Sequence, residues 1–267
     1  MDSVRKKAKE LLDNNTVNVI IGYGEGSDNN VRAIFIHKPE DVDKLIYDER
    51  CVQNLAFYLM KHEVKHKGKL GIVAPLTVLR TILQVASEYQ VKEDVVVVLG
   101  VAPDGGYIEF NGFKDIENYI ATISIDLPEK EKEMIKKLEG MSLEQRWQFW
   151  TKQLSRCIKC YACRATCPMC YCTRCQVECN QPQWVTVEAT PLGNLEWHFM
   201  RAMHLAGRCV NCGECARACP LGIPINLLTY KTVLTVKDKF DTYAGTTASM
   251  DSVLSSYKTD DKENFIR

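Results

Sequence analysis

Two copies of one cysteine pattern lie close together in the second half of the chain. The first copy reads Cys157-Ile-Lys-Cys160-Tyr-Ala-Cys163-Arg-Ala-Thr-Cys167-Pro168, and the second reads Cys209-Val-Asn-Cys212-Gly-Glu-Cys215-Ala-Arg-Ala-Cys219-Pro220. Each copy is C-x2-C-x2-C-x3-C-P, a spacing at which cysteine thiolates hold 4Fe-4S clusters. A single run is also compatible with chance or with zinc, but two complete runs favour iron–sulfur chemistry.

The spacing also indicates which cluster each cysteine binds. Three cysteines separated by two residues wrap one cluster, and the fourth, which precedes proline, ligates the other cluster. We therefore assign cluster I to Cys157, Cys160, Cys163 and Cys219, and cluster II to Cys209, Cys212, Cys215 and Cys167. No residue is assigned a catalytic role, because no general acid, base or nucleophile stands out.

Four further cysteines follow the first run: Cys170, Cys172, Cys175 and Cys179. Their C-x-C-x2-C-x3-C spacing is not a standard run. We favour a third iron–sulfur cluster, because the thirteen cysteines without Cys51 make three sets of four. Zinc, which accepts four thiolates, is the second alternative. Free thiols are the third, although crowded thiolates repel and oxidise. Cys51 is expected to be a buried thiol without metal.

Composition excludes several classes of protein. The 267 residues suit one large domain or two ordinary ones, and 34 basic against 34 acidic residues give no electrostatic reason to propose nucleic acid. Clustered cysteines without an apolar leader favour metal binding in a reducing compartment over a disulfide scaffold. No apolar run approaches the roughly 20 residues of a membrane helix. We expect a soluble, cytoplasmic protein from an anaerobe, because paired low-potential clusters tolerate oxygen poorly.

The segment before the cysteines predicts a small α/β domain. Residues 17–37 read as a hairpin whose glycine-rich turn opens no helix, so a phosphate-binding loop is disfavoured. Residues 70–74 and 95–100 are apolar throughout, as in buried strands of a parallel sheet. Further elements are expected as helices at 3–14, 39–47, 52–66, 75–89 and 115–122, and as a short strand at 107–110.

Helices are expected to lead into and out of the cysteine runs. A charged helix at 129–140 is followed by Ser142 with Gln145 three residues later, a capping-box pattern. A helix at 192–206, stopped by Gly207, carries His198 and His204, which we expect to be ordinary packed or solvated side chains. An amphipathic helix ends near Phe240 and an extended tail follows.

The predicted fold class is α+β, with four segments along the chain. They are an α/β domain at 1–126, a helical linker at 127–156, a ferredoxin-like 4Fe-4S dicluster domain at 157–225 with an insertion at 169–208, and a helix with an extended tail at 226–267.

Two family resemblances accompany these patterns. The run from Cys209 to Pro224 resembles the dicluster domain of iron–sulfur electron-transfer subunits, including small subunits of heterodisulfide reductase-like complexes. Residues 46–56 and 70–80 resemble the beta subunits of deazaflavin-dependent hydrogenases and formate dehydrogenases. That family's beta subunits bind FAD and reduce the deazaflavin coenzyme. Here Pro75-Leu-Thr stands where a small-residue and cysteine loop is expected, so no flavin ligands are assigned.

The resemblances imply an electron-transfer subunit of a multi-subunit anaerobic oxidoreductase. Its partners would be a flavoprotein, hydrogenase, formate dehydrogenase or heterodisulfide reductase-like subunit. The alternative is a flavin-containing catalytic subunit that exchanges electrons with a small-molecule carrier, and a third reading makes the N-terminal domain a docking scaffold only. Basic residues beside the predicted ligands either raise cluster potentials or merely keep the surface soluble. These residues are Lys159, Arg164, Arg208 and Arg217.

Overall fold

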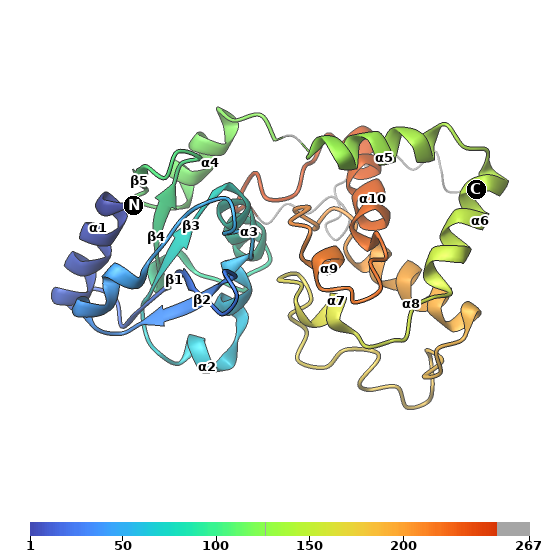
Figure 1. Ribbon diagram of the computed structural model, residues 1–267, viewed down its shortest axis with the longest axis horizontal. Coiled ribbons are helices and arrows are strands. Elements are labelled where there is room, and N and C mark those ends of the chain that lie inside the picture. Colours follow the sequence, from blue (N-terminus) through green and yellow to red (C-terminus); the bar gives the residue numbers. More distant parts are fainter. Residues whose placement is uncertain (126, 250–267) are drawn as a thin grey trace, which may run out of the picture.

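The computed structural model describes residues 1–125 and 127–249, and the expected tail beyond residue 249 lies outside the described residues. Figure 1 shows a sheet with its helices at one end of the molecule and a mainly helical, cysteine-bearing part at the other. The fold is mixed α/β, with one five-stranded sheet. No helix of the described residues is both apolar enough and long enough to cross a bilayer.

The sheet has the strand order β2-β1-β3-β4-β5. Its strands are β1 (Val19–Glu25), β2 (Val31–Ile36), β3 (Leu70–Ala74), β4 (Val96–Val101) and β5 (Tyr107–Glu109). β1, β3 and β4 run parallel, while β2 and β5 are antiparallel at the two edges. The predicted hairpin and the buried parallel strands are therefore confirmed. The carboxyl ends of the three parallel strands share one edge of the sheet.

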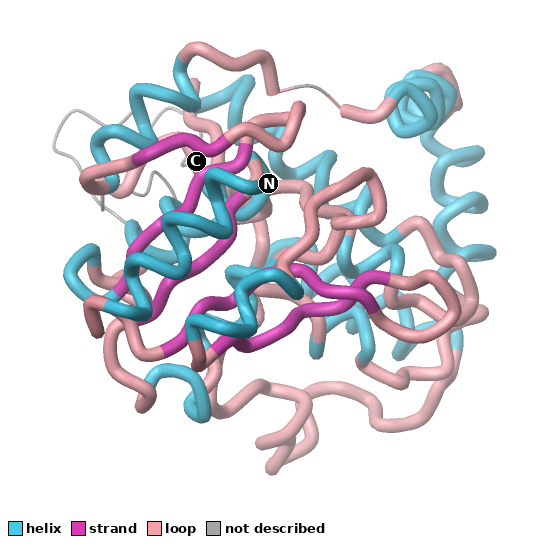
Figure 2. Tube along the Cα trace, turned by 60° about the vertical axis from the view of Figure 1, so that its left-hand side comes forward, coloured by secondary structure: helices cyan, strands magenta, loops and turns pink. Residues whose placement is uncertain are grey.

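Helices cover both faces of the central strands. α1 (Asp2–Asp13) lies on one side, and α3 (Leu76–Ser87) with α4 (Phe113–Ala121) lies on the other (Figure 1). Every residue of β3 is buried as a result. The tube view in Figure 2 shows the magenta strands lying behind covering helices. Such two-sided cover explains why β3 and β4 read as continuous apolar runs.

The hairpin glycines allow close packing and are not part of a phosphate-binding loop among the described residues. Gly22 and Gly24 lie inside β1, which leads into another strand and opens no helix. A Cβ on Gly22 would overlap the side chain of Leu45, and one on Gly24 would meet Ile34 Cγ2 at 2.7 Å. Close approach of neighbouring side chains therefore requires glycine at these positions.

Two predicted helices are wrong. Residues 39–47 form only the 3₁₀ helix η1 (Pro39–Lys44), and 52–66 divide into η2 (Leu55–Met60) and the single turn α2 (His62–Lys65). Lys61 has extended backbone between the last two, which interrupts the helical ladder. Burial of the apolar η2 residues against β3 and α3 outweighs the preference of this segment for a regular helix.

The remaining helices belong to the cysteine-bearing part. They are α5 (Glu129–Glu139), α6 (Leu143–Leu154), α7 (Ala162–Ala165), α8 (Pro191–His204), α9 (Glu214–Arg217) and α10 (Ile225–Phe240). The capping box of Ser142 and Gln145 at α6 is confirmed. α7 and α9 lie inside the two cysteine runs and contact each other, while α8 packs on α6 and α10. All strands of the described residues lie before α5.

The polar face of α3 joins the sheet to the cysteine-bearing part. Arg80 donates to the carbonyl oxygens of Val210 and Ala244 at 2.9 and 2.7 Å. One turn later the Gln84 side-chain oxygen accepts from the Gly245 N–H at 2.9 Å. Two turns after Arg80, Glu88 accepts from Arg208 and from Tyr171, at 2.6 and 2.5 Å. The apolar side of the same helix packs into the core around the sheet.

Candidate metal centre

The four thiols predicted for cluster I line one small cavity of about 20 Å³. They are Cys157, Cys160, Cys163 and Cys219. Contact between α7 and α9 brings Cys219 beside the first run although it ends the second. Burial raises the pKa of Cys163, and the charges of Cys157, Cys160 and Cys219 raise it further. The rest of the wall is mostly apolar, with Leu221, Ile223 and Ile225 among its residues.

The four thiols predicted for cluster II are mutual neighbours. Burial raises the pKa of Cys209, Cys212 and Cys215 to about 12 each. The charge of Cys167 adds to the shift of all three, so it lies among them. The fourth cysteine of each run thus lies beside the thiols of the other run. Buried thiols of this kind ionise when a metal ion or cluster, or another positive charge, favours the thiolate.

A buried arginine lies between the two groups of thiols. Arg201 on α8 is only 3% exposed and donates to the Cys163 carbonyl oxygen at 3.1 Å. Its Nε and Nη1 have no hydrogen-bond partner among the described residues. Burial lowers the pKa of Arg201, but Cys167, Cys215, Cys170 and Cys163 outweigh burial and raise it.

The buried positive charge of Arg201 indicates whether an anionic cluster fits between these thiols. A buried guanidinium is costly without anionic partners, and neutral thiols do not compensate it. Thiolates that ligate a cluster on each side of the guanidinium would compensate its charge. No three His, Cys, Asp or Glu side chains of the described chain are placed to hold a single ion. A cubane separates its thiolates more than a tetrahedral ion does.

The third set of cysteines is not gathered in one place. Cys170 forms a hydrogen bond with Cys167, which lowers the pKa of Cys167 and raises that of Cys170. Cys175 lies beside Arg164, and Cys179 accepts from Arg174 Nε at 3.3 Å. Cys172 is exposed. In this arrangement the four thiols contact different partners.

The basic residues chosen from sequence are already paired. Their partners are carboxylates or carbonyl oxygens: Lys159 donates to Thr186, while Arg164, Arg208 and Arg217 pair with Glu178, Glu88 and Glu214. Sequence reasoning instead missed Arg201, and it gave His198 no specific role. His198 is 1% exposed, lines the cluster I cavity, and has no partner for either ring nitrogen among the described residues. Burial, followed by Arg201, lowers the pKa of His198 to about 4. His198 is thus a packed side chain and His204 an exposed one, both within the expectation for histidines on this helix.

A large cleft of about 560 Å³ lies where the parallel strands end. Tyr23, Pro75 and Val101 line it from the sheet, and residues 210–213 line it from the second cysteine run. Ligands of open α/β sheets bind at the carboxyl ends of the strands. Cys51 also lines the cleft, and burial raises the pKa of its thiol. Cys212 therefore connects the cluster II group to the preferred ligand position of the sheet.

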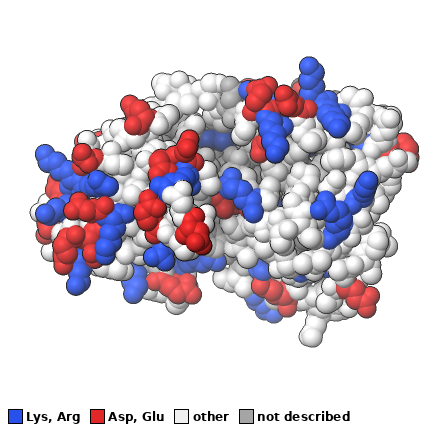
Figure 3. Space-filling view, viewed as in Figure 1, with Lys and Arg blue, Asp and Glu red and all other residues white. Residues whose placement is uncertain are grey.

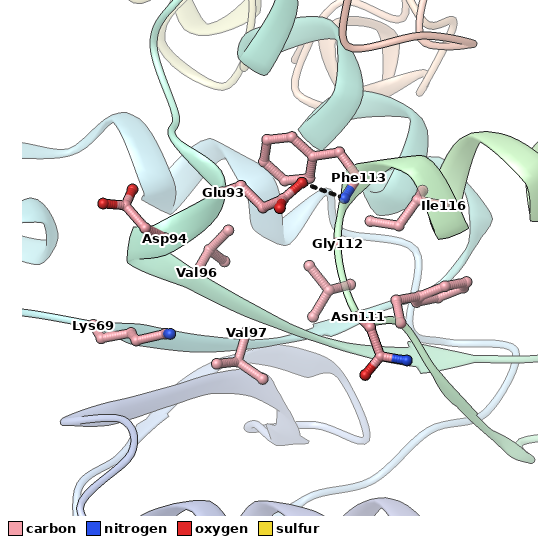
Figure 4. Close-up of a pocket in the computed structure, with 11 residues that line it drawn as sticks. Lys69, Glu93, Asp94, Val96, Val97, Asn111, Gly112, Phe113 and Ile116 are labelled. Carbon is pink, nitrogen blue, oxygen red and sulfur yellow. Dashed lines mark hydrogen bonds between the residues drawn. The ribbon is translucent and has the colours of Figure 1, made fainter.

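Another cavity, of about 480 Å³, lies at the opposite edge of the sheet (Figure 4). Glu93 accepts a 2.6 Å hydrogen bond from the Phe113 N–H, which satisfies the first turn of α4. The rest of the wall includes Val96, Val97 and Ile116. This arrangement stabilises a helix start and lies far along the strands from Cys212.

No protein-family model matches the chain. A segment of 108 residues is 33% identical to the F420-dependent formate dehydrogenase subunit beta of Methanocaldococcus jannaschii, covering 39% of this chain and 28% of that protein. A segment of 57 residues is 34% identical to the F420-dependent formate dehydrogenase 1 subunit beta of Methanococcus maripaludis, covering 21% and 14%. The chain thus matches less than a third of the length of these relatives, and the predicted similarity to such beta subunits is confirmed.

Proposed function

We propose that this chain is an iron–sulfur electron-transfer subunit of an oxidoreductase complex and binds two 4Fe-4S clusters. The observation that carries the proposal is the crossed grouping of the cysteines around Arg201. Cys219 lies with the first run and Cys167 with the second, and the buried guanidinium of Arg201, two of whose nitrogens have no hydrogen-bond partner among the described residues, lies between them. The similarity to formate dehydrogenase beta subunits supports membership in an oxidoreductase complex.

The residues around the two clusters would give each cluster its own route for electron transfer to the surface. A bound 4Fe-4S cluster takes up or releases one electron at a time. Cys160 is exposed in the cluster I group, while Cys212 of the cluster II group lines the sheet-edge cleft. Apolar side chains on the cluster I wall limit the access of water. The arrangement therefore suits a relay between a partner at one end and the cleft at the other.

Exposed apolar side chains favour a partner beside the cluster I group. Val52 and Tyr89 apart, the large apolar residues of the described chain with more than half of their surface exposed lie on α6, α8 and the loops beside them: Leu143, Trp147, Ile158, Trp184, Val187, Leu192 and Met203. Apolar surface of this kind is typical of subunit interfaces. In Figure 3, basic and acidic side chains are interspersed most densely over the sheet end of the molecule, while much of the cysteine-bearing end is white. We propose a flavoprotein, hydrogenase, formate dehydrogenase or heterodisulfide reductase-like subunit as the partner.

Metal analysis of anaerobically purified protein tests the cluster content. Two cubanes give about eight iron atoms per chain, and a third gives about twelve. About eight irons with about one zinc would instead assign zinc to the cysteines from Cys170 to Cys179. Because these thiols contact different partners, a cluster or zinc there requires the loop to rearrange. Iron near zero after reconstitution with iron and sulfide would contradict the proposed function.

The cleft supports a second candidate function, in which the chain itself binds a flavin and acts on a small-molecule carrier. Its position at the strand ends beside Cys212 is the observation that favours this function. The aromatic rings of Tyr47 and Tyr119 and the buried Arg80 offer stacking surface and positive charge.

Flavin titration of Thr77→Trp tests this candidate. Thr77 lines the cleft, so an indole there should weaken FAD binding at least tenfold, measured by flavin fluorescence. Thr235→Trp, on the exposed side of α10, is the matched control and should bind as the wild type does. Equal affinities in both variants would place any flavin outside the cleft. Without a partner, we expect no oxidation of a nicotinamide or deazaflavin donor by this chain.

A further inference from the structure

One face of α8 is turned toward the first cysteine run. Asn194 donates to the Cys157 carbonyl oxygen at 2.8 Å, and Arg201 donates to the Cys163 carbonyl oxygen at 3.1 Å. His198 lies four residues after Asn194 and three before Arg201, so the three side chains share one helix face. Two measured contacts thus fix the helix on either side of the histidine.

His198 is polar, buried and unsatisfied. It is 1% exposed, and neither Nδ1 nor Nε2 has a hydrogen-bond partner in the described part of the chain. Buried polar groups in folded proteins nearly always have partners, so a missing partner requires an explanation. An imidazole carries at least one N–H in either protonation state and so always offers a donor.

The cavity next to His198 supplies the explanation. Its wall contains the four thiols of the cluster I group, together with Tyr161, Trp197 and aliphatic residues. Apart from the Tyr161 hydroxyl, the acceptors among these side chains are sulfur atoms. Four thiolates already complete the coordination of a cubane, which leaves the imidazole no iron to bind. A hydrogen bond to sulfur is the remaining role.

We propose that His198 donates a hydrogen bond to a sulfur atom of cluster I and thereby raises the reduction potential of that cluster relative to cluster II. A donor to cluster sulfur stabilises the more negative, reduced state. Arg201 lies beside thiols of both groups, whereas His198 lines the cavity of only one. His198 is therefore the residue of α8 that distinguishes the two potentials. The inference rests on the proposed presence of both clusters.

Potentiometric titration followed by EPR tests the inference in the full chain. In His198→Leu, the ratio of reduced to oxidised cluster I at a fixed potential should fall about tenfold, equivalent to about 59 mV for one electron, with cluster II unchanged. His198→Gln keeps an N–H donor and should recover most of the loss. His204→Leu, an exposed site on the same helix, is the matched control and should titrate as the wild type does.

A second measurement does not depend on the folding of a variant. In wild-type protein labelled with ¹⁵N-histidine, pulsed EPR of reduced cluster I should show a nitrogen coupling. The label on the exposed His204 serves as an internal background. Absence of the coupling, or an unchanged potential in a His198→Leu chain with full iron content, would overturn the inference alone. Loss of iron from the wild-type protein would instead overturn the proposed function.

Discussion

Cys160→Ser and Cys212→Ser should each lose about four iron atoms per chain, and the two variants should lose different EPR signals. Serine oxygen is a poorer ligand for iron in a cubane than thiolate. The loss should be separate because Cys160 lines the cavity with Cys219, whereas Cys212 lies among Cys167, Cys209 and Cys215. Iron analysis and EPR of dithionite-reduced protein make the measurement.

Cys51→Ala is the control for these variants. Its thiol accepts from the Asp48 N–H at 3.4 Å and packs in the core around the sheet, so iron content should stay at the wild-type value. Full iron in both serine variants would contradict the ligand assignment. Loss of the same EPR signal in both would contradict the crossed grouping, even if iron fell.

Arg201→Met should lower the potentials of both clusters. A positive charge at about 5 Å, with an effective dielectric constant of about 20, favours an added electron by about 3 kcal/mol. That energy corresponds to a shift on the order of 100 mV for one electron. The reduced clusters lose this stabilisation when methionine replaces the guanidinium at similar volume. Redox titration monitored by EPR measures both midpoints in one experiment.

Arg201→Lys separates charge from shape. It keeps the positive charge but loses the planar donor to the Cys163 carbonyl oxygen, so the potentials should be recovered in part. Arg208→Met provides the comparison, because Arg208 is already neutralised by Glu88 and should shift either potential far less. Equal shifts for Arg201→Met and Arg208→Met would remove the argument for a special role of the buried arginine.

Local rules predicted the elements whose stability is decided locally. The apolar runs of β3 and β4 need cover on both faces, and the capping box at Ser142 satisfies its own helix start. η2 could not be predicted in this way, because its conformation depends on burial against β3 and α3. Periodicity within one segment contains no information about such distant neighbours.

The candidate centre shows the same division. The spacing of each cysteine run predicts the crossed grouping, because the rule for the fourth ligand is contained in the run itself. Arg201 and His198 come from the insertion and lie beside thiols only because α8 packs on α6 and α10. Cations adjacent in sequence, such as Arg208, are instead neutralised by carboxylates. The sequence does contain a signal of this helix face, because polar residues such as Asn194 recur at helical spacing along it.

The loop at 210–213 is part of both the second cysteine run and the wall of the sheet-edge cleft. It contains Cys212 of the second run, it forms part of the cleft wall, and Arg80 of α3 holds its Val210 carbonyl oxygen. Two sites that share one segment are thermodynamically linked, and such linkage acts equally in both directions. A molecule that favours one loop arrangement from the cleft must therefore favour or oppose metal at Cys212. A metal bound at Cys212, as proposed above, would change the free energy of binding in the cleft by the same amount.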